Sequence, residues 1–279
     1  MPEVFQKLAF HEQLILAVLF ASLGLCFLVG MGGYLIRRIR KNSSLPPVPL
    51  FPGAVFPAAF DYCYTIIFLI GFSLSIASVF FTPETADNST TGATWLQLAI
   101  SLAVQTCLYL PFIVRFYLLP PRPGSDISFW RLLSMCLLCL AAITIPTFTI
   151  ELFGGLEWIM EVTRCPEHQD IVETFAGGSL AEKIVIAVAA VIIAPITEEC
   201  CFRGFLYNIL KQHATRWLAI SASALFFGAI HGSVAQLIPL TIFGIVQCLA
   251  YDKARSLRLP ILVHALFNSL SLLYILLIA

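Results

Sequence analysis

Long apolar runs separated by short polar connections constrain this chain more than any other feature of its sequence. A helix needs about 20 apolar residues to cross the hydrocarbon core of a bilayer. Hydrophobic residues make up 59% of the 279 residues and charged residues only 11%, whereas a soluble domain carries about 25% charged residues. We therefore predict an all-α polytopic membrane protein with about eight transmembrane helices. The expected spans are residues 13–36, 59–82, 96–119, 129–150, 181–212, 217–232, 234–251 and 258–279.

The basic residues predict how the chain is oriented in the membrane. Twelve of the sixteen flank every second connection between the spans. The remaining connections are flanked only by Lys7, Arg164 and Lys183, and the sixteenth basic residue, Arg203, lies within a span. Because basic connections stay in the cytosol, we expect both termini outside, together with the 151–182 loop and a short amphipathic segment on the membrane surface. The basic cluster RRIRK follows the first apolar run, so this run is predicted to be an uncleaved span. The formal net charge of zero gives no reason to expect a nucleic-acid partner.

The cysteines are predicted to be reduced and packed. Eight of the nine lie in apolar segments, and Cys165 is the exception. This distribution argues against a disulfide framework. Cys136 and Cys139 form a CxxC within an apolar run, where we favour plain packing over redox or metal chemistry.

Seven ionisable or amide side chains interrupt the predicted spans. Such residues are expensive in lipid, so each suggests a function and a partner. Six of the seven fall in the last four spans, which we predict to be the catalytic core. The seven are Asp61, Glu198, Glu199, Arg203, His231, His264 and Asn268.

The fifth span carries two adjacent carboxylates and an arginine within APITEECCFRG. Glu199 and Arg203 are four residues apart with the acid first, so they share a helix face and should pair. Glu198 lies about 100° around the helix from Glu199, so Arg203 cannot easily serve both acids. One carboxylate is therefore held, and the other is left to exchange protons with water. Pro195 is expected to kink the helix and open room for water.

Two further motifs lie on later spans. Phe227 and His231 are four apart in FFGAIHG on the sixth span, and His264 and Asn268 are four apart in LVHALFNS on the eighth. Counted from the cytosolic ends at ~1.5 Å per residue, Glu198, His231 and His264 lie at depths of roughly 20, 21 and 9 Å. Tilt or the kink must therefore bring them together.

Structural interpretations exist for each element taken alone. A single histidine in an apolar helix is more often a hydrogen-bonded core residue than a catalyst, and Glu199–Arg203 fits a structural pair as well as a functional one. Phe227 is best interpreted as packing. The combination of two acids, an arginine, two histidines and an amide in four successive spans favours a catalytic centre, because such groups are costly to keep in lipid.

These motifs resemble those of a known family. EExxxR, FxxxH and HxxxN, in this order on consecutive membrane segments, are similar to the motifs of the CPBP family. That family contains the type II CAAX prenyl endopeptidases and the bacteriocin-processing and self-immunity proteins often called Abi proteins. The resemblance covers about residues 180–279. It implies an all-helical intramembrane protease with a cavity open to the cytosol.

The resemblance also implies a role for each motif residue. Glu198 would be the general base that activates water, and His231 would help to position that water. His264 and Asn268 would polarise the scissile carbonyl or hold its oxyanion, while Glu199 and Arg203 would order the site. Zinc is left open as a cofactor, with Glu198, His231 and His264 as its ligands. Because HExxH is absent, no compact pair of ligands lies on one helix, and we favour metal-free chemistry.

We accordingly divide the chain into three parts. Residues 1–153 form N-terminal transmembrane helices of unassigned role, residues 154–180 an extracytoplasmic loop, and residues 181–279 the core that resembles a CAAX protease. The expected substrate is a membrane-embedded or lipid-anchored protein or peptide, cleaved in a bacterial inner membrane from the cytosolic side. The alternatives are a non-catalytic immunity or scaffold protein of the same fold and a proton-coupled transporter.

Overall fold

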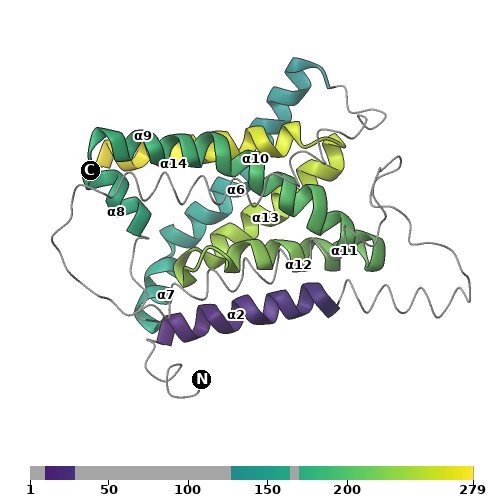
Figure 1. Cartoon of the computed structure of the whole chain (residues 1–279), viewed down its shortest axis with the longest axis horizontal. Helices are drawn as coiled ribbons and strands as arrows, with labels where there is room; N and C mark the ends of the chain where they lie inside the picture. The colour runs from purple at the N-terminus through teal and green to yellow at the C-terminus, as the bar shows by residue number, and fades with distance from the viewer. Residues whose placement is uncertain (1–9, 29–126, 164–169, 279) are drawn as a thin grey trace, which may run out of the picture. The chain divides into compact units, whose positions relative to one another are not determined.

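A computed structural model describes residues 10–28, 127–163 and 170–278 of the chain, and these residues are helical without any strand. The fold class is therefore confirmed as all-α. The helices, labelled as in Figure 1, are α2 (Phe10–Phe27), α6 (Phe129–Leu152), α7 (Gly155–Thr163), α8 (Asp170–Gly177), α9 (Leu180–Val188), η2 (Ala189–Ile193), α10 (Ala194–Glu199), η3 (Cys200–Leu206), α11 (Tyr207–His213), α12 (Arg216–Ala229), α13 (Val234–Ala254) and α14 (Arg258–Ile278).

Four of the expected spans are confirmed as helices long and apolar enough to cross a membrane. They are α6, the continuous helix Leu180–His213, α13 and α14. The sixth expected span is shorter than predicted, because α12 has 14 residues, about 21 Å at 1.5 Å per residue. The first expected span begins as α2 and is followed only to residue 28, and spans 59–82 and 96–119, with Asp61, lie outside the described residues.

The chain divides into two compact units, which we describe separately. Unit 1 contains Met1–Thr82, Ala141–Pro166 and Phe205–Leu249, and unit 2 contains Pro83–Leu140, Glu167–Gly204 and Ala250–Ala279. Three expected site elements, the carboxylate pair, Arg203 and the HxxxN motif, fall in unit 2, whereas the FxxxH motif falls in unit 1.

In unit 1, α12 packs against α2 and α11. Glycines let α12 and α13 approach closely: a Cβ on Gly244 would lie 2.8 Å from Ala224 Cα, and one on Gly228 would lie 2.8 Å from Thr241 Oγ1. Small residues at helix contacts are typical of membrane proteins, where close packing replaces the hydrophobic effect.

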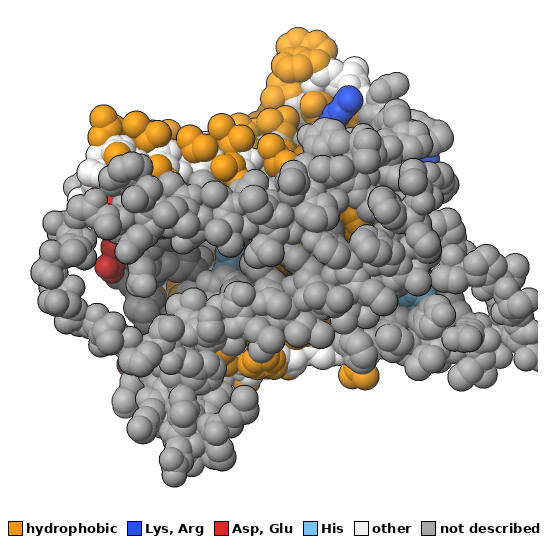
Figure 2. All heavy atoms as spheres, viewed as in Figure 1, with side chains coloured by type: hydrophobic (Ala, Val, Ile, Leu, Met, Phe, Trp, Pro, Cys, Tyr) orange, Lys and Arg blue, Asp and Glu red, His pale blue; other side chains and the backbone are white. Residues whose placement is uncertain are grey.

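In unit 2, α14 lies alongside η2 and α10, and α8 packs on α9 (Figure 1). A capping box starts α9, in which the Ser179 N–H donates to Glu182 Oε2 over 2.6 Å. Figure 2 shows hydrophobic side chains gathered over the region where Figure 1 places α9 and α14. Leu180 and Ile184 of α9 and Leu270 and Leu273 of α14 are exposed. An apolar surface of this kind is expected on a protein that contacts lipid.

The 151–182 loop contains the two short helices α7 and α8. On α7, Trp158 and Val162 are exposed beside the acids Glu157 and Glu161. Ile159 and Met160 of the same helix pack against a buried cluster in unit 1, so the helix is amphipathic, as the sequence predicted. The six cysteines of the described residues are free thiols, four of them in pairs close in sequence, at 136 and 139 and at 200 and 201. This agrees with the packed, reduced thiols that we predicted.

Candidate active site

The helix that carries the carboxylates is irregular on both sides of them. The π-helical segment η2 comes directly before α10, and a second π-helical segment, η3, follows it. Segments of this type are rare and occur often at functional sites. Pro195 is the second residue of α10, so the disturbance that the sequence predicted at this proline is a widened turn just before the acids.

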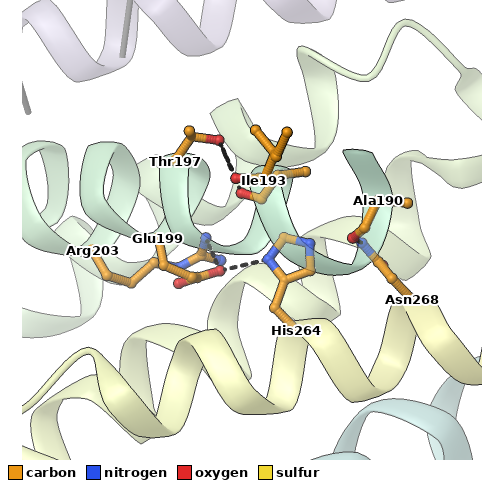
Figure 3. Close-up of polar contacts among 8 residues, drawn as sticks. Ala190, Ile193, Thr197, Glu199, Arg203, His264 and Asn268 are labelled. Atoms are coloured by element: carbon orange, nitrogen blue, oxygen red, sulfur yellow. Dashed lines mark hydrogen bonds and ion pairs between the residues drawn. The ribbon is translucent and has the colours of Figure 1, made fainter. Parts of the chain in front are cut away.

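Glu199 is the centre of a buried polar cluster in unit 2 (Figure 3). Its Oε1 accepts a hydrogen bond from Arg203 Nη1 at 3.0 Å and lies 2.9 Å from His264 Nδ1. Glu199 is fully buried, and Arg203 and His264 are 1% and 4% exposed. The predicted pairing of Glu199 with Arg203 is therefore confirmed, and His264 on α14 joins it.

The contact between His264 and Glu199 fixes a proton on the imidazole ring. A carboxylate oxygen can only accept a hydrogen bond, so Nδ1 of His264 must be the donor. In a neutral imidazole the other ring nitrogen is then an acceptor. It becomes a donor only when the ring is protonated.

Glu198 differs from its neighbour in its surroundings. The side chain is half-buried, and its Oε2 atom is buried without a hydrogen-bond partner among the described residues. Buried polar atoms are nearly always hydrogen-bonded in folded proteins, and an exception needs an explanation such as a catalytic role or a water. The two adjacent carboxylates thus differ in their hydrogen bonds. Glu199 accepts from Arg203 and His264, whereas Glu198 has no such bond with the described residues.

Asn268 lies one turn beyond His264 on α14 and contacts the same helix. Its Nδ2 donates to the carbonyl oxygen of Ala190 at 2.7 Å (Figure 3). Ala190 belongs to the π-helical segment before the acids. The HxxxN motif therefore attaches α14 at two points, to Glu199 through His264 and to Ala190 through Asn268.

His231 belongs to unit 1, and the structure corrects its predicted position in the sixth span. Because α12 ends at Ala229, His231 lies in the turn that follows, and Gly232, with φ 72°, completes that turn. Glycine takes this left-handed conformation without strain. Nδ1 of His231 donates to the Phe227 carbonyl at 2.7 Å, and the two rings lie 4.8 Å apart.

Phe227 packs in unit 1 as the sequence predicted. It is buried, and its ring stacks on that of Phe243 at 5.6 Å.

Five of the six predicted site residues thus belong to unit 2, and three of them are in direct contact. Sequence analysis missed the carbonyl of Ala190, because an alanine in an apolar run carries no signal of its own. The available signal was Pro195, five residues later.

The cluster was tested as a zinc site. Within the parts of the chain that the structure describes, no three His, Cys, Asp or Glu side chains are grouped so that they could hold a metal ion. The predicted ligand His264 directs Nδ1 toward Glu199. Only the other ring nitrogen of His264 could therefore bind a metal, and His231 belongs to the other compact unit. Zinc binding by Glu198, His231 and His264 stays a prediction, and we route no step through a metal.

Comparison with known proteins gives similarity to membrane proteases. Residues 180–270 match the family described as type II CAAX prenyl endopeptidase Rce1-like. An uncharacterised 24.3 kDa protein of Escherichia coli is 29% identical over 127 residues, which cover 44% of this chain and 58% of that protein. The putative membrane peptidase YdiL of Bacillus subtilis is 25% identical over 85 residues, covering 30% of this chain and 35% of YdiL.

The membrane-embedded CAAX protease MroQ of Staphylococcus aureus is 26% identical over 193 residues, covering 64% of this chain and 73% of MroQ. No solved structure matches the chain. The chain spans about 58% and 35% of the first two relatives. The family match, these relatives and the three motifs therefore support a membrane protease similar to those of the CPBP family, and the similarity is carried by residues 180–270.

Proposed function

We propose that the protein is an intramembrane endopeptidase that hydrolyses a peptide bond of a membrane-associated or lipid-anchored protein or peptide. The observation that carries the proposal is the contrast between the two adjacent carboxylates. Oε1 of Glu199 is held by Arg203 and His264, whereas the half-buried side chain of Glu198 makes no hydrogen bond with the described residues. A carboxylate in this state is suited to take a proton from water.

In the proposed reaction, Glu198 removes a proton from water as the water oxygen attacks the scissile carbonyl carbon. The carbonyl π bond opens, and its electron pair moves onto oxygen. Collapse of the tetrahedral intermediate breaks the C–N bond, and Glu198 returns its proton to the leaving amine. The carboxylate ends the cycle ionised, and the products are one new carboxyl group and one new amino group.

We propose that the protonated form of His264 stabilises the oxyanion. With Nδ1 donating to Glu199, protonated His264 has its second N–H for the developing negative charge, and such a preoriented donor lowers the barrier. Glu199 and Arg203 act through His264 by fixing its orientation and its proton. His231 is assigned to holding the attacking water, as the FxxxH motif implies.

We further propose that the site is reached from the cytosolic side of a bacterial inner membrane. The basis is the asymmetry of the basic residues, twelve of which flank alternate connections.

The decisive experiment compares membrane proteomes of cells that carry the wild type, Glu198→Gln or Glu173→Gln. Glu173 lies exposed on α8 and serves as the matched control. A peptide terminus should be generated by the wild type and the control and be absent with Glu198→Gln, while all three proteins insert equally. Failure to find any such terminus, with an unchanged phenotype in Glu198→Gln, would favour the scaffold alternative.

A further inference from the structure

The π-helical segment before the acids leaves one backbone carbonyl without a partner from its own helix. The N–H of Ala194 donates to the carbonyl of Ala189, five residues earlier. In the same register, the donor for the Ala190 carbonyl would be the N–H of residue 195. That residue is Pro195, which has no N–H.

Asn268 supplies the missing donor. Its Nδ2 lies 2.7 Å from the Ala190 oxygen, a good distance for an N–H···O bond. A carbonyl left unpaired in an apolar environment is costly, so this hydrogen bond compensates for the proline. The same helix, α14, carries His264 one turn earlier, and His264 contacts Glu199.

We propose that Asn268 is a positioning residue that pairs with the carbonyl freed by Pro195 and thereby holds His264 against Glu199. The role implied by the family resemblance, direct contact with the oxyanion, is different. This inference rests on the proposed function for its activity readout, but its stability readout requires no substrate.

A substitution at Pro195 separates the two roles. In Pro195→Ala, residue 195 regains an N–H that can serve the Ala190 carbonyl, so Asn268 becomes less necessary. Asn268→Ala alone should lower the folding equilibrium constant roughly tenfold, because a buried carbonyl loses its donor. The same change in the Pro195→Ala background should lower it by less than about threefold.

Activity should follow the same pattern. We expect kcat/KM to fall at least tenfold in Asn268→Ala and to recover at least fivefold in the double variant. The matched control combines Asn268→Ala with Pro239→Ala, a proline within α13 of unit 1, and should show no recovery. If Asn268 instead contacts the oxyanion, activity stays equally low with either residue at position 195 and the stability effects add. That result overturns the proposal.

A spectroscopic measurement keeps the test independent of how well Pro195→Ala folds. The carbonyl carbon of Ala190 is labelled with ¹³C, and its resonance is compared in the wild type and Asn268→Ala. Loss of the hydrogen bond should shift it upfield, and an unchanged resonance would contradict the proposal. If no variant cleaves any substrate but the coupling and the shift are present, the proposed function fails and the positioning role stands.

Discussion

Replacing either of two adjacent glutamates by glutamine makes the same chemical change in two different environments. Glu198→Gln removes a charge at a half-buried residue with one unpartnered oxygen, and Glu199→Gln removes a charge that holds Arg203 and His264. The pair of variants therefore separates a carboxylate used for chemistry from one used to hold the site.

The expected magnitudes follow from the contacts. Hydrogen bonds to a charged group contribute about 1.5–3 kcal/mol each, and Glu199 accepts two of them at 3.0 and 2.9 Å. Breaking a buried ion pair from one side costs about 3–5 kcal/mol. Because glutamine keeps one acceptor oxygen, Glu199→Gln should lower the free energy of unfolding by about 3 kcal/mol, at the low end of that range. Glu198→Gln should change it by less than about 1 kcal/mol, because its side chain makes no hydrogen bond with the described residues that could be lost.

The assay is denaturant unfolding in detergent micelles, followed by the fluorescence of the four tryptophans, alongside cleavage of the substrate found by proteomics. Glu198→Gln should be fully inactive and stable, and Glu199→Gln should be impaired in both respects. A third variant, Glu199→Leu with Arg203→Met, should recover most of the stability and remain inactive, because an apolar pair of similar volume replaces the ions. Equal destabilisation by the two single glutamine variants would refute the assignment of roles.

Three further outcomes are expected. Gly244→Ala should lower the free energy of unfolding by about 1–3 kcal/mol, because the added Cβ would lie 2.8 Å from Ala224. Gly24→Ala should leave it unchanged, because nothing lies within 4 Å of the added Cβ. The fluorescence assay above measures both variants. A chelator should leave the cleavage rate of purified protein intact, and complete loss that zinc reverses would reverse our preference for metal-free chemistry. An impermeant maleimide should label Lys253→Cys only from the cytosolic side and Glu173→Cys only from outside; the opposite pattern would invert the proposed topology.

Several features of the site could be predicted because they depend on local spacing. Glu199 and Arg203 are four apart on a helix, so their pairing follows from helix geometry alone. The long apolar runs predicted α6, α13 and α14 for a similarly local reason.

Counting residues from the helix ends gave unequal depths on two helices that the structure brings into contact at the site. Glu198 was placed roughly 11 Å deeper than His264 by counting from helix ends, yet His264 contacts the next residue, Glu199. The helix Leu180–His213 has 34 residues, about 51 Å at 1.5 Å per residue, which exceeds a hydrocarbon core of about 30 Å. A helix of this length must tilt, bend or extend beyond the core, so counting residues from its end overestimates depth.

Other features could not be predicted, because they depend on which backbone groups form hydrogen bonds once the helices have packed. The end of α12 at Ala229 leaves His231 in a turn, although FFGAIHG continues a helical pattern. The π-helical register before Pro195 and the partner of Asn268 likewise depend on the packing of α14.

The cluster explains how a membrane protein can keep two adjacent carboxylates. With His264 protonated, as the proposed mechanism requires, Arg203 and His264 carry two positive charges and the two glutamates carry two negative charges. The group is then neutral as a whole, so its burial avoids the large penalty of an uncompensated charge. In the proposed reaction, the negative charge that Glu198 loses when it takes a proton from water appears on the oxyanion. The total therefore stays at zero throughout the reaction, and the chemistry adds no net charge to the site.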